Sequence, residues 1–425
     1  MSVVLKSSLS WIDNNKEARE KVLGLLSQFN EKDSRDELGI GSIRDRISDL
    51  LFPGTSTIQT RLRYFFFVPW LYQEAEKNYL NDKESLKLID QLERNLITTL
   101  MQSDDLEGVF GKTSGRALKR LPSSVYWSGL EKWGIKKESC SQSEYFDRAK
   151  FLGAKRAELE KEITHLQKRN DDYSKAQIQK NNASIWDIHL PKAPQDFPHS
   201  ANLKITAEEA VFIKDQLRKH CGESLLAHLA DNTRYESSQD IDTPWDHPEF
   251  GHFDIEMQLL LHHAEFFSVL IHGAYLLYNM LLAQLSKDDE VSKNYEDQLC
   301  KWYLKLQYRD SKAFGLDNWS LDVFWSMIER RKVSYAEPIV INGMTKKFIE
   351  AWLKILKLKD PDFYKSKDVV VFIKEREKRL KGARSRFSNK KALEQWGGAS
   401  GVNELRYRWS TAKQFLKDLS VHEGI

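Results

Sequence analysis

Along most of the chain, apolar residues recur every three to four positions, as they do on one face of a helix. No stretch alternates apolar and polar residues in the way that a half-buried strand does. From residue 204 onward, the pattern predicts helices at 206–219, 254–285, 294–307, 320–330, 344–357, 367–382 and 403–419. Before residue 152 it predicts shorter helices joined by glycine-containing turns. One run, 369–373, also fits a strand, but the elements together predict an all-α or predominantly α fold.

Two stretches of unusual composition divide this pattern. Residues 154–182 are highly charged with few apolar positions, which is typical of a solvated helix or a short coiled-coil arm. Residues 183–203 contain three prolines and predict an extended linker. We therefore predict two helical domains, with the second carrying a long core helix and a basic C-terminal third. The boundaries are an N-terminal domain at 1–152, the arm and linker at 153–203, and a C-terminal domain at 204–425.

The composition is that of a globular chain in a reducing compartment. Of 425 residues, 41% are hydrophobic and 30% charged, so the chain can bury a core without disulfides or a structural metal. The three cysteines are far apart and form no CxxC pair. The N-terminus does not resemble a signal peptide, so we expect a cytoplasmic protein. The only candidate membrane segment, 266–285, is interrupted by His272 and Asn279. It is interpreted as a buried core helix, so no membrane partner is expected.

The first two predicted helices resemble a helix-turn-helix. Helices at 42–52 and 56–68 flank Pro53-Gly54, and their lengths suit this motif. The second helix would present Gln59, Arg61 and Arg63, which are side chains that contact base edges and phosphates. A structural explanation stays open, because Ser56 with Gln59 forms a capping box and the arginines can pair with carboxylates inside the fold.

Charge is distributed unevenly although the net charge is only +3. Residues 187–256 have a balance of −8 and residues 330–418 a balance of +13. The densest basic run comprises Lys374, Arg376, Lys378, Arg379, Lys381, Arg384, Arg386, Lys390 and Lys391. On a helix, this density predicts salt-dependent, sequence-independent nucleic-acid binding, with stacking from Trp396 and the 406–409 segment. The alternative is a solvated helix that packs on the acidic region.

Histidines and carboxylates cluster between residues 240 and 272. Five of the eleven histidines fall there, and imidazoles with carboxylates are the usual ligands of zinc, manganese or iron. The alternative metal ligands are His247, His252, His262 and Glu265, with Asp246 or Glu249 as general base. His262 and Glu265 share a helix face at i,i+3. A polar seam on the long helix that faces solvent or a polar neighbour explains the same spacing without a metal.

Several segments together resemble an uncharacterised bacterial family, described as a domain of unknown function. They are RDELGIGSIRD at 35–45, LFPGTSTIQTRLR at 51–63, YFFFVPW at 64–70, LPSSVYWSGL at 121–130, HGAYLLYN at 272–279 and YRW at 407–409. That family is similar to proteins of bacterial anti-phage islands, encoded near helicases and phospholipase-D-type nucleases. The resemblance implies a role in defence, and it implies no catalytic residue.

From these observations we expect a non-catalytic component of an anti-phage system that binds nucleic acid, DNA above all. It would work with a helicase or nuclease partner and need no cofactor. The alternative is a metal-dependent, nuclease-like hydrolase that uses a divalent metal at the histidine cluster. A third possibility is a purely structural scaffold.

Overall fold

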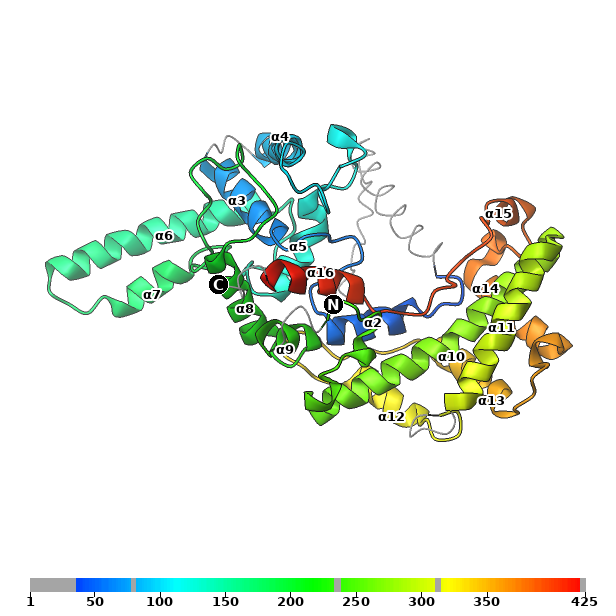
Figure 1. Cartoon of the computed structure of the whole chain (residues 1–425). Helices are drawn as coiled ribbons and strands as arrows, with labels where there is room; N and C mark the ends of the chain where they lie inside the picture. The colour runs from blue at the N-terminus through cyan, green and yellow to red at the C-terminus, as the bar shows by residue number, and fades with distance from the viewer. Residues whose placement is uncertain (1–35, 78–81, 233–237, 310–314, 421–425) are drawn as a thin grey trace, which may run out of the picture. The chain divides into compact units, whose positions relative to one another are not determined.

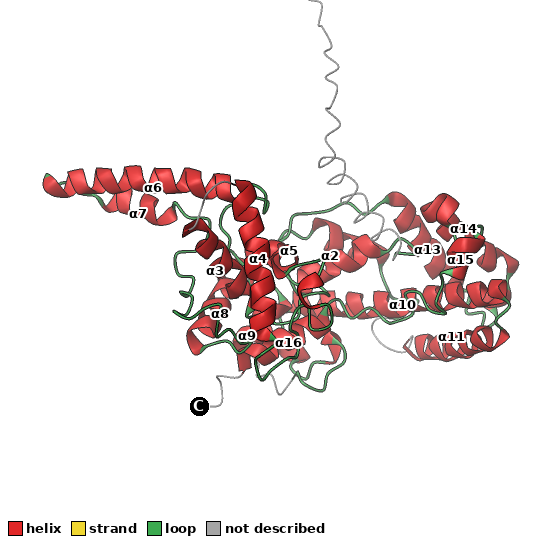
Figure 2. Ribbon diagram, turned by 90° about the horizontal axis from the view of Figure 1, so that it is seen from above, coloured by secondary structure: helices red, strands yellow, loops and turns green. Residues whose placement is uncertain are grey.

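A computed structural model of the chain describes residues 36–77, 82–232, 238–309 and 315–420. Over these residues the protein is helical, and no strand is present beyond two isolated bridges (Figures 1 and 2). The helices are α2 (Gly41–Leu51), α3 (Tyr64–Lys77), α4 (Asp82–Leu100), α5 (Pro122–Lys132), α6 (Tyr145–Lys168), α7 (Ser174–Asn182), α8 (Ala207–Cys221), α9 (Leu225–Asn232), α10 (Ile255–Ser286), α11 (Asp289–Arg309), α12 (Leu321–Trp325), α13 (Gly343–Lys357), α14 (Lys367–Lys381), α15 (Lys390–Glu394) and α16 (Trp409–Ser420). The predicted fold class is confirmed, and the 369–373 run is helical.

The described chain forms two compact units, each built from segments distant in sequence. Unit 1 comprises Met1–Ser42, Phe266–Ser320 and Ile341–Leu405. Unit 2 comprises Ile43–Glu265, Leu321–Val340 and Arg406–Ile425. Two units were expected, but their boundaries differ from the predicted ones, because the proline-rich stretch 183–203 lies inside unit 2.

The proline-rich stretch is bound to the core of unit 2 and is not a free linker. The indole Nε1 of Trp70 donates to the carbonyl of Pro191 at 2.7 Å, and Arg63 donates to the carbonyl of Asn202 at 2.9 Å. Leu190 and Leu203 are buried on either side of these bonds. Prolines therefore mark an irregular but packed segment here.

Aromatic side chains fill the core of unit 2 around α3. Phe65 of α3 stacks on Trp133 with ring centroids 3.9 Å apart, and Tyr126 of α5 meets the same ring edge-on. The helix continues through Pro69 to Lys77. Burial of such large rings contributes strongly to the stability of a core.

The apolar part of α10 organises unit 1. Tryptophans from two other helices dock on it, because Trp302 of α11 donates to Val269 O at 2.7 Å and Trp352 of α13 donates to Leu270 O at 2.8 Å. By length and composition α10 is the one described helix apolar enough to cross a membrane, yet 94% of its apolar window is buried in protein. The predicted core helix is confirmed.

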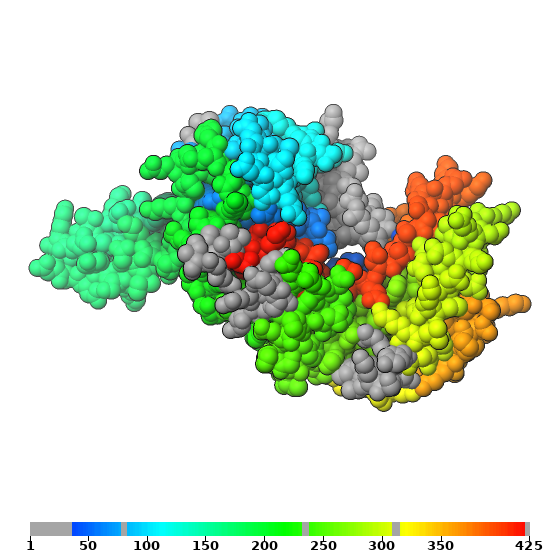
Figure 3. Space-filling view, viewed as in Figure 1, coloured from blue at the N-terminus to red at the C-terminus, as the bar shows by residue number. Residues whose placement is uncertain are grey.

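A two-helix arm extends from unit 2. Helix α6 starts against the core of that unit, and its outer part lies beside α7 and projects away from the unit (Figures 1 and 3). They share a small apolar cluster of Leu159, Ile163 and Ala176. An ion pair between Lys180 and Glu160 at 2.8 Å lies close to this cluster. The charged arm predicted from composition is therefore a helical hairpin with its own contacts.

Candidate functional site

The predicted helix-turn-helix is wrong at its second helix. The first helix, α2, lies where expected, but residues 56–63 form turns and the next helix begins at Tyr64. Gln59 is 5% exposed, and its Oε1 accepts from Ser56 N at 2.9 Å while its Nε2 donates to Gly54 O at 3.1 Å. One half of the predicted capping box is thus present, and it closes a turn instead of starting a helix.

The two arginines of this segment are structural. Arg61 is 7% exposed, with its Nε 2.9 Å from Asp418 Oδ1 and its Nη1 2.6 Å from Asp105 Oδ2. Arg63 is 6% exposed and lies 3.0 Å from Glu209 Oε1. Both guanidinium groups therefore form buried ion pairs inside unit 2 and are not available at its surface.

The basic run from 374 to 391 is not one continuous helix. Helix α14 ends at Lys381, where Gly382 adopts a φ of +53°, a left-handed conformation that glycine adopts readily. A single 3-10 turn, Gly382–Arg384, follows, and α15 begins only at Lys390. The nine basic residues therefore lie on two helices and the turn between them.

Three of the nine basic side chains serve internal contacts of unit 1. Arg376 is buried, donates to Leu38 O at 2.9 Å, and lies over the ring of Phe348. Arg386 donates to Glu37 at 2.7 Å. Lys381 is buried beside the same carboxylate. These three residues were predicted to bind nucleic acid. In the structure their side chains instead connect α14 and the turn after it to Glu37 and Leu38, just before α2.

The remaining basic side chains lie at the surface of unit 1. Arg379, Arg384, Lys390 and Lys391 are exposed, and Lys374 and Lys378 are half-buried. No acidic residue occurs between Lys378 and Leu393. The exposed charge of this segment is therefore entirely positive, and we name these four exposed cations the basic surface.

The predicted stacking residues differ in accessibility. Trp396 is half-buried and lines a groove of about 880 Å³ with Phe387 and Leu393, while its Nε1 donates to Asn279 Oδ1 at 3.1 Å. Tyr407 and Trp409 are buried in unit 2 and donate to main-chain carbonyls. Among the aromatic residues predicted to stack, only Trp396 is partly exposed, and the rings of Tyr407 and Trp409 are unavailable for stacking in this structure.

The predicted metal ligands do not come together. The buried ring of His247 is engaged at both nitrogens, with Nε2 3.0 Å from Ser238 Oγ and Nδ1 accepting from Glu249 N at 3.2 Å. Burial also lowers its pKa. His262 packs against the ring of Phe250, and His252 is exposed. Within the described ranges, no three His, Cys, Asp or Glu side chains are placed to hold one ion.

The polar seam on α10 binds the chain segment 396–405 within unit 1. Ser268 Oγ accepts from Leu405 N at 2.8 Å, and Asn279 Oδ1 accepts from Ser400 N at 2.8 Å. His272 Nδ1 lies 3.6 Å from Glu404. The His272 imidazole and the Lys305 ammonium together lower the pKa of Glu404 to about 2. The polar neighbour that was one explanation for this spacing is the 396–405 segment. It accounts for Ser268, His272 and Asn279 of the seam.

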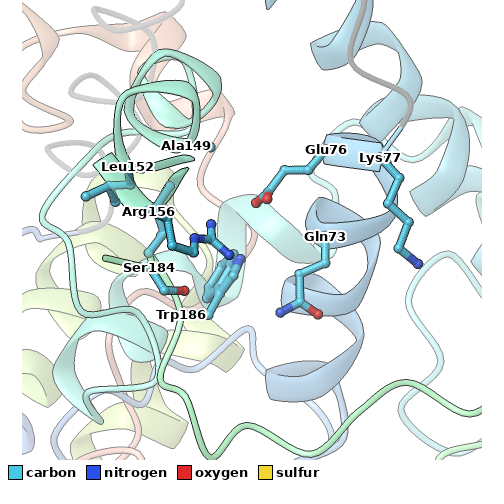
Figure 4. Close-up of a pocket in the computed structure, with 9 residues that line it drawn as sticks. Gln73, Glu76, Lys77, Ala149, Leu152, Arg156, Ser184 and Trp186 are labelled. Carbon is cyan, nitrogen blue, oxygen red and sulfur yellow. The ribbon is translucent and has the colours of Figure 1, made fainter. Parts of the chain in front are cut away.

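One cavity in unit 2 was not foreseen from the sequence. It measures about 380 Å³ and lies between α3, α6 and the segment 184–186. Glu76 and Arg156 extend toward each other across it (Figure 4). Trp186 Nε1 donates to the hydroxyl of Tyr145 at 2.7 Å, and that hydroxyl donates to Glu76. Glu76 belongs to no sequence motif. It lies near the end of α3, directly after the last buried residue of that helix.

Burial sets the protonation of the groups beside this cavity. It raises the pKa of the Glu76 carboxyl, although the hydrogen bond from Tyr145 and the nearby Arg156 act against the rise. Burial and the Glu76 carboxylate together raise the pKa of Tyr145 well above its usual value. The arrangement is a fixed tyrosine–glutamate pair at a small opening, with no second carboxylate among the residues lining it.

The sequence matches a family of unknown function, DUF6361, over residues 6–172 and 164–422. The chain belongs to the DUF6361 family. Both matched ranges together cover nearly the whole chain, in agreement with the resemblance noted from segments between residues 35 and 409. No curated protein and no solved structure matches this DUF6361 protein.

Proposed function

We propose that this DUF6361 protein binds nucleic acid, DNA above all, through its basic surface. The observation that carries the proposal is that Arg379, Arg384, Lys390 and Lys391 are all exposed with no acidic residue between them. Cations of this kind displace counterions from a phosphate backbone, which gives affinity without sequence preference. Gln59, Arg61 and Arg63 are buried, so the proposal assigns no base contacts to the region predicted as a helix-turn-helix.

We further propose a non-catalytic role in a bacterial anti-phage system, with a helicase or nuclease partner in the cytoplasm. This part rests on the resemblance drawn from the sequence. The arm of α6 and α7 is the surface we assign to the partner protein. It carries exposed apolar side chains, Phe151 and Ile178, at 58% and 61% exposure. Exposed apolar residues on a projecting element are typical of interaction sites.

The metal-dependent hydrolase finds less support. It requires His247, His252, His262 and Glu265 to share an ion, and the described residues offer no such group. The non-catalytic proposal needs no rearrangement of these side chains.

The test is fluorescence anisotropy of the full chain with duplex DNA, single-stranded DNA and RNA at low and moderate salt. One variant replaces all four basic-surface residues, Arg379, Arg384, Lys390 and Lys391, with glutamine. We expect a loss of affinity of at least tenfold and a shallower salt dependence. The slope of log K against log salt should fall by roughly 0.9 for each phosphate contact removed.

The matched control replaces four exposed lysines of the arm, Lys155, Lys161, Lys168 and Lys175, with glutamine. It removes the same charge, so a purely global charge effect would weaken binding equally in both variants. Such an equal loss, or no binding by the wild type even at low salt, would contradict the proposal.

A further inference from the structure

A groove of about 880 Å³ lies in unit 1 between two parts of the chain that are distant in sequence. One side is formed by the end of α10 and the start of α11, and the other by residues 386–398, which include α15. Sites for small organic groups measure about 300–1,000 Å³, so the groove is large enough for such a group.

Apolar side chains line the groove from both sides. Residues 386–398 contribute Phe387, Leu393 and Trp396, which are half-buried, and the opposite side contributes Val291 and the exposed Leu285. Ligand sites are lined mainly by hydrophobic and aromatic side chains. Because two of these five side chains are aromatic, the lining favours a flat ring over a hydrated ion.

Both aromatic rings are held by other residues of unit 1. Trp396 Nε1 donates to Asn279 Oδ1 at 3.1 Å, and the ring of Phe387 meets that of Tyr278 edge-on, with centroids 5.6 Å apart. An indole has one N–H donor, so the part of Trp396 that remains for a ligand is its apolar ring surface. Rings fixed before a ligand arrives lower the entropic cost of binding.

The space next to Trp396 is open. Gly397 and Gly398 follow it in the chain and line the groove. A Cβ added to either glycine would meet nothing within 4 Å apart from its chain neighbours. A flat group that lies against the indole can therefore also approach the main chain closely, which glycine permits because it has no side chain.

Charged groups at the groove favour an anionic ligand. Three cations and two carboxylates are part of the lining: Lys287, Arg386, Lys390, Asp288 and Glu394. Asp288 Oδ1 accepts from Val291 N at 3.1 Å, and Glu394 lies 3.9 Å from Lys390 in an exposed pair, which contributes little energy. Since Lys390 also belongs to the basic surface, a phosphate backbone bound there lies at the edge of the groove.

We infer that the groove binds an unpaired base of a DNA strand, which stacks on the ring of Trp396 while an adjoining phosphate contacts Lys390. An apolar peptide or an acyl chain would use the apolar lining but not the cations. Stacking on an aromatic side chain tolerates any base, because every base has a flat face. In a duplex the bases are already paired and stacked, and moving one out costs free energy. The inference deepens the proposed function and rests on it for the strand.

The experiment compares a labelled single strand, a strand of equal length that carries abasic sites throughout, and a duplex. Anisotropy is measured on the full chain at one salt concentration. We expect the base-bearing strand to bind about tenfold more tightly than the abasic strand, which has the same phosphates. Trp396→Ala should abolish this difference and leave the affinity for the duplex unchanged. Trp396→Phe keeps a ring and should preserve part of the difference.

A second variant leaves Trp396 and its bond to Asn279 in place. Gly397→Leu adds a side chain in the open part of the groove, so it should reduce the difference between the two strands while the Tm stays close to that of the wild type. The matched control is Gly343→Leu at the start of α13, where an added Cβ also meets nothing within 4 Å. Gly343 does not line the groove, so this variant should bind both strands as the wild type does.

The outcomes separate the groove from the proposed function. Equal, salt-dependent binding of the base-bearing and abasic strands by the wild type would overturn the inference and leave the proposed function standing. Absence of binding to any strand, even at low salt, would overturn the proposed function. Thermal unfolding with adenosine, which has a base and no phosphate, then tests the groove alone. A rise in Tm for the wild type but not for Trp396→Ala would assign the groove to a free nucleoside, and no rise would overturn the base site as well.

Discussion

Buried arginines hold distant segments together in both units. Arg61 ties the turn before α3 to Asp418 of α16, and Arg376 ties α14 to the carbonyls of Leu38 and Gly39. Arginine suits this task because it stays charged and offers five donors in a fixed plane. From the sequence, such arginines look the same as the exposed Arg379 and Arg384. Pairing of Arg61 and Arg63 inside the fold was one of two open interpretations. The sequence could not decide between them, because the partners Asp418 and Glu209 lie 357 and 146 residues away along the chain.

The Arg61–Asp418 pair gives the first prediction. Arg61→Met should lower the free energy of unfolding by about 3–5 kcal/mol, because it leaves a buried carboxylate without its partner. Urea unfolding measures this change. The matched control is Arg44→Met, which breaks an exposed pair with Asp45 and should change stability by less than about 1 kcal/mol. Nucleic-acid affinity of the folded Arg61 variant should equal that of the wild type; a selective loss of affinity at full stability would restore the base-contact interpretation.

A second prediction concerns Glu93 in α4. Its carboxylate accepts from Ser123 N and Ser123 Oγ, and burial raises its pKa from 4.5 to about 7. A raised carboxyl pKa in the folded state contributes stability that is complete below pH 4.5 and is lost as the pH rises to about 7. Wild-type stability should therefore fall between pH 5 and pH 8 by about 2–3 kcal/mol relative to Glu93→Gln. Urea unfolding of both proteins at each pH gives the difference, and parallel curves would contradict it.

The helix boundaries were predicted from local sequence signals. Some of these predictions were right and others were wrong, each for an identifiable reason. The long apolar run predicted α10 to within a residue at each end, since apolar periodicity over thirty residues has no other structural meaning in a packed protein. The start of α3 was misplaced because Ser56 and Gln59 bond to each other in a turn. The helix predicted at 367–382 matches α14, but the nine basic residues were read together on a helix although the chain breaks at Gly382, and glycine alone does not reveal a left-handed φ.

A prediction about single helices concerns two glycines, whose replacement by alanine should change stability in opposite directions. A Cβ added to Gly273 of α10 would lie 2.2 Å from the ring of Trp302, which is itself fixed by its bond to Val269 O. Gly273→Ala should therefore destabilise the protein by about 1–3 kcal/mol through overpacking. Gly153→Ala in α6 meets nothing within 4 Å and should stabilise it by about 0.5–1 kcal/mol through helix propensity. Thermal unfolding of both variants tests the pair, and equal shifts would contradict it.

At the scale of the molecule, composition predicted that there are two units but not which segments form them. Prolines and charge runs are local features, whereas the units are defined by contacts between segments far apart in sequence. Unit 2 includes α16, held by Arg61–Asp418, and the 321–340 segment, where Arg46 donates to Ile328 O at 2.7 Å. No single-sequence signal connects residue 61 with residue 418.

This organisation predicts which cuts the chain tolerates. A fragment of residues 1–203, which ends at the expected linker, lacks Glu209, Asp418 and the 321–340 segment, so Arg61, Arg63 and Arg46 lose buried partners together. It should show no cooperative urea transition. By contrast, replacing residues 161–179 of the full chain with a short Gly-Ser linker removes only the arm's own apolar contacts.

The arm deletion should keep a cooperative transition, with Tm within a few degrees of the wild type. The side chains of Glu160 and Lys180 form an ion pair, with Oε1 and Nζ 2.8 Å apart, so a short flexible linker can join the two residues. Circular dichroism during urea unfolding compares the two proteins directly. A cooperative transition in fragment 1–203 would mean that the N-terminal segment has a core of its own. Loss of cooperativity in the arm deletion would mean that the arm stabilises unit 2, and it would then be a structural element rather than a surface for a partner protein.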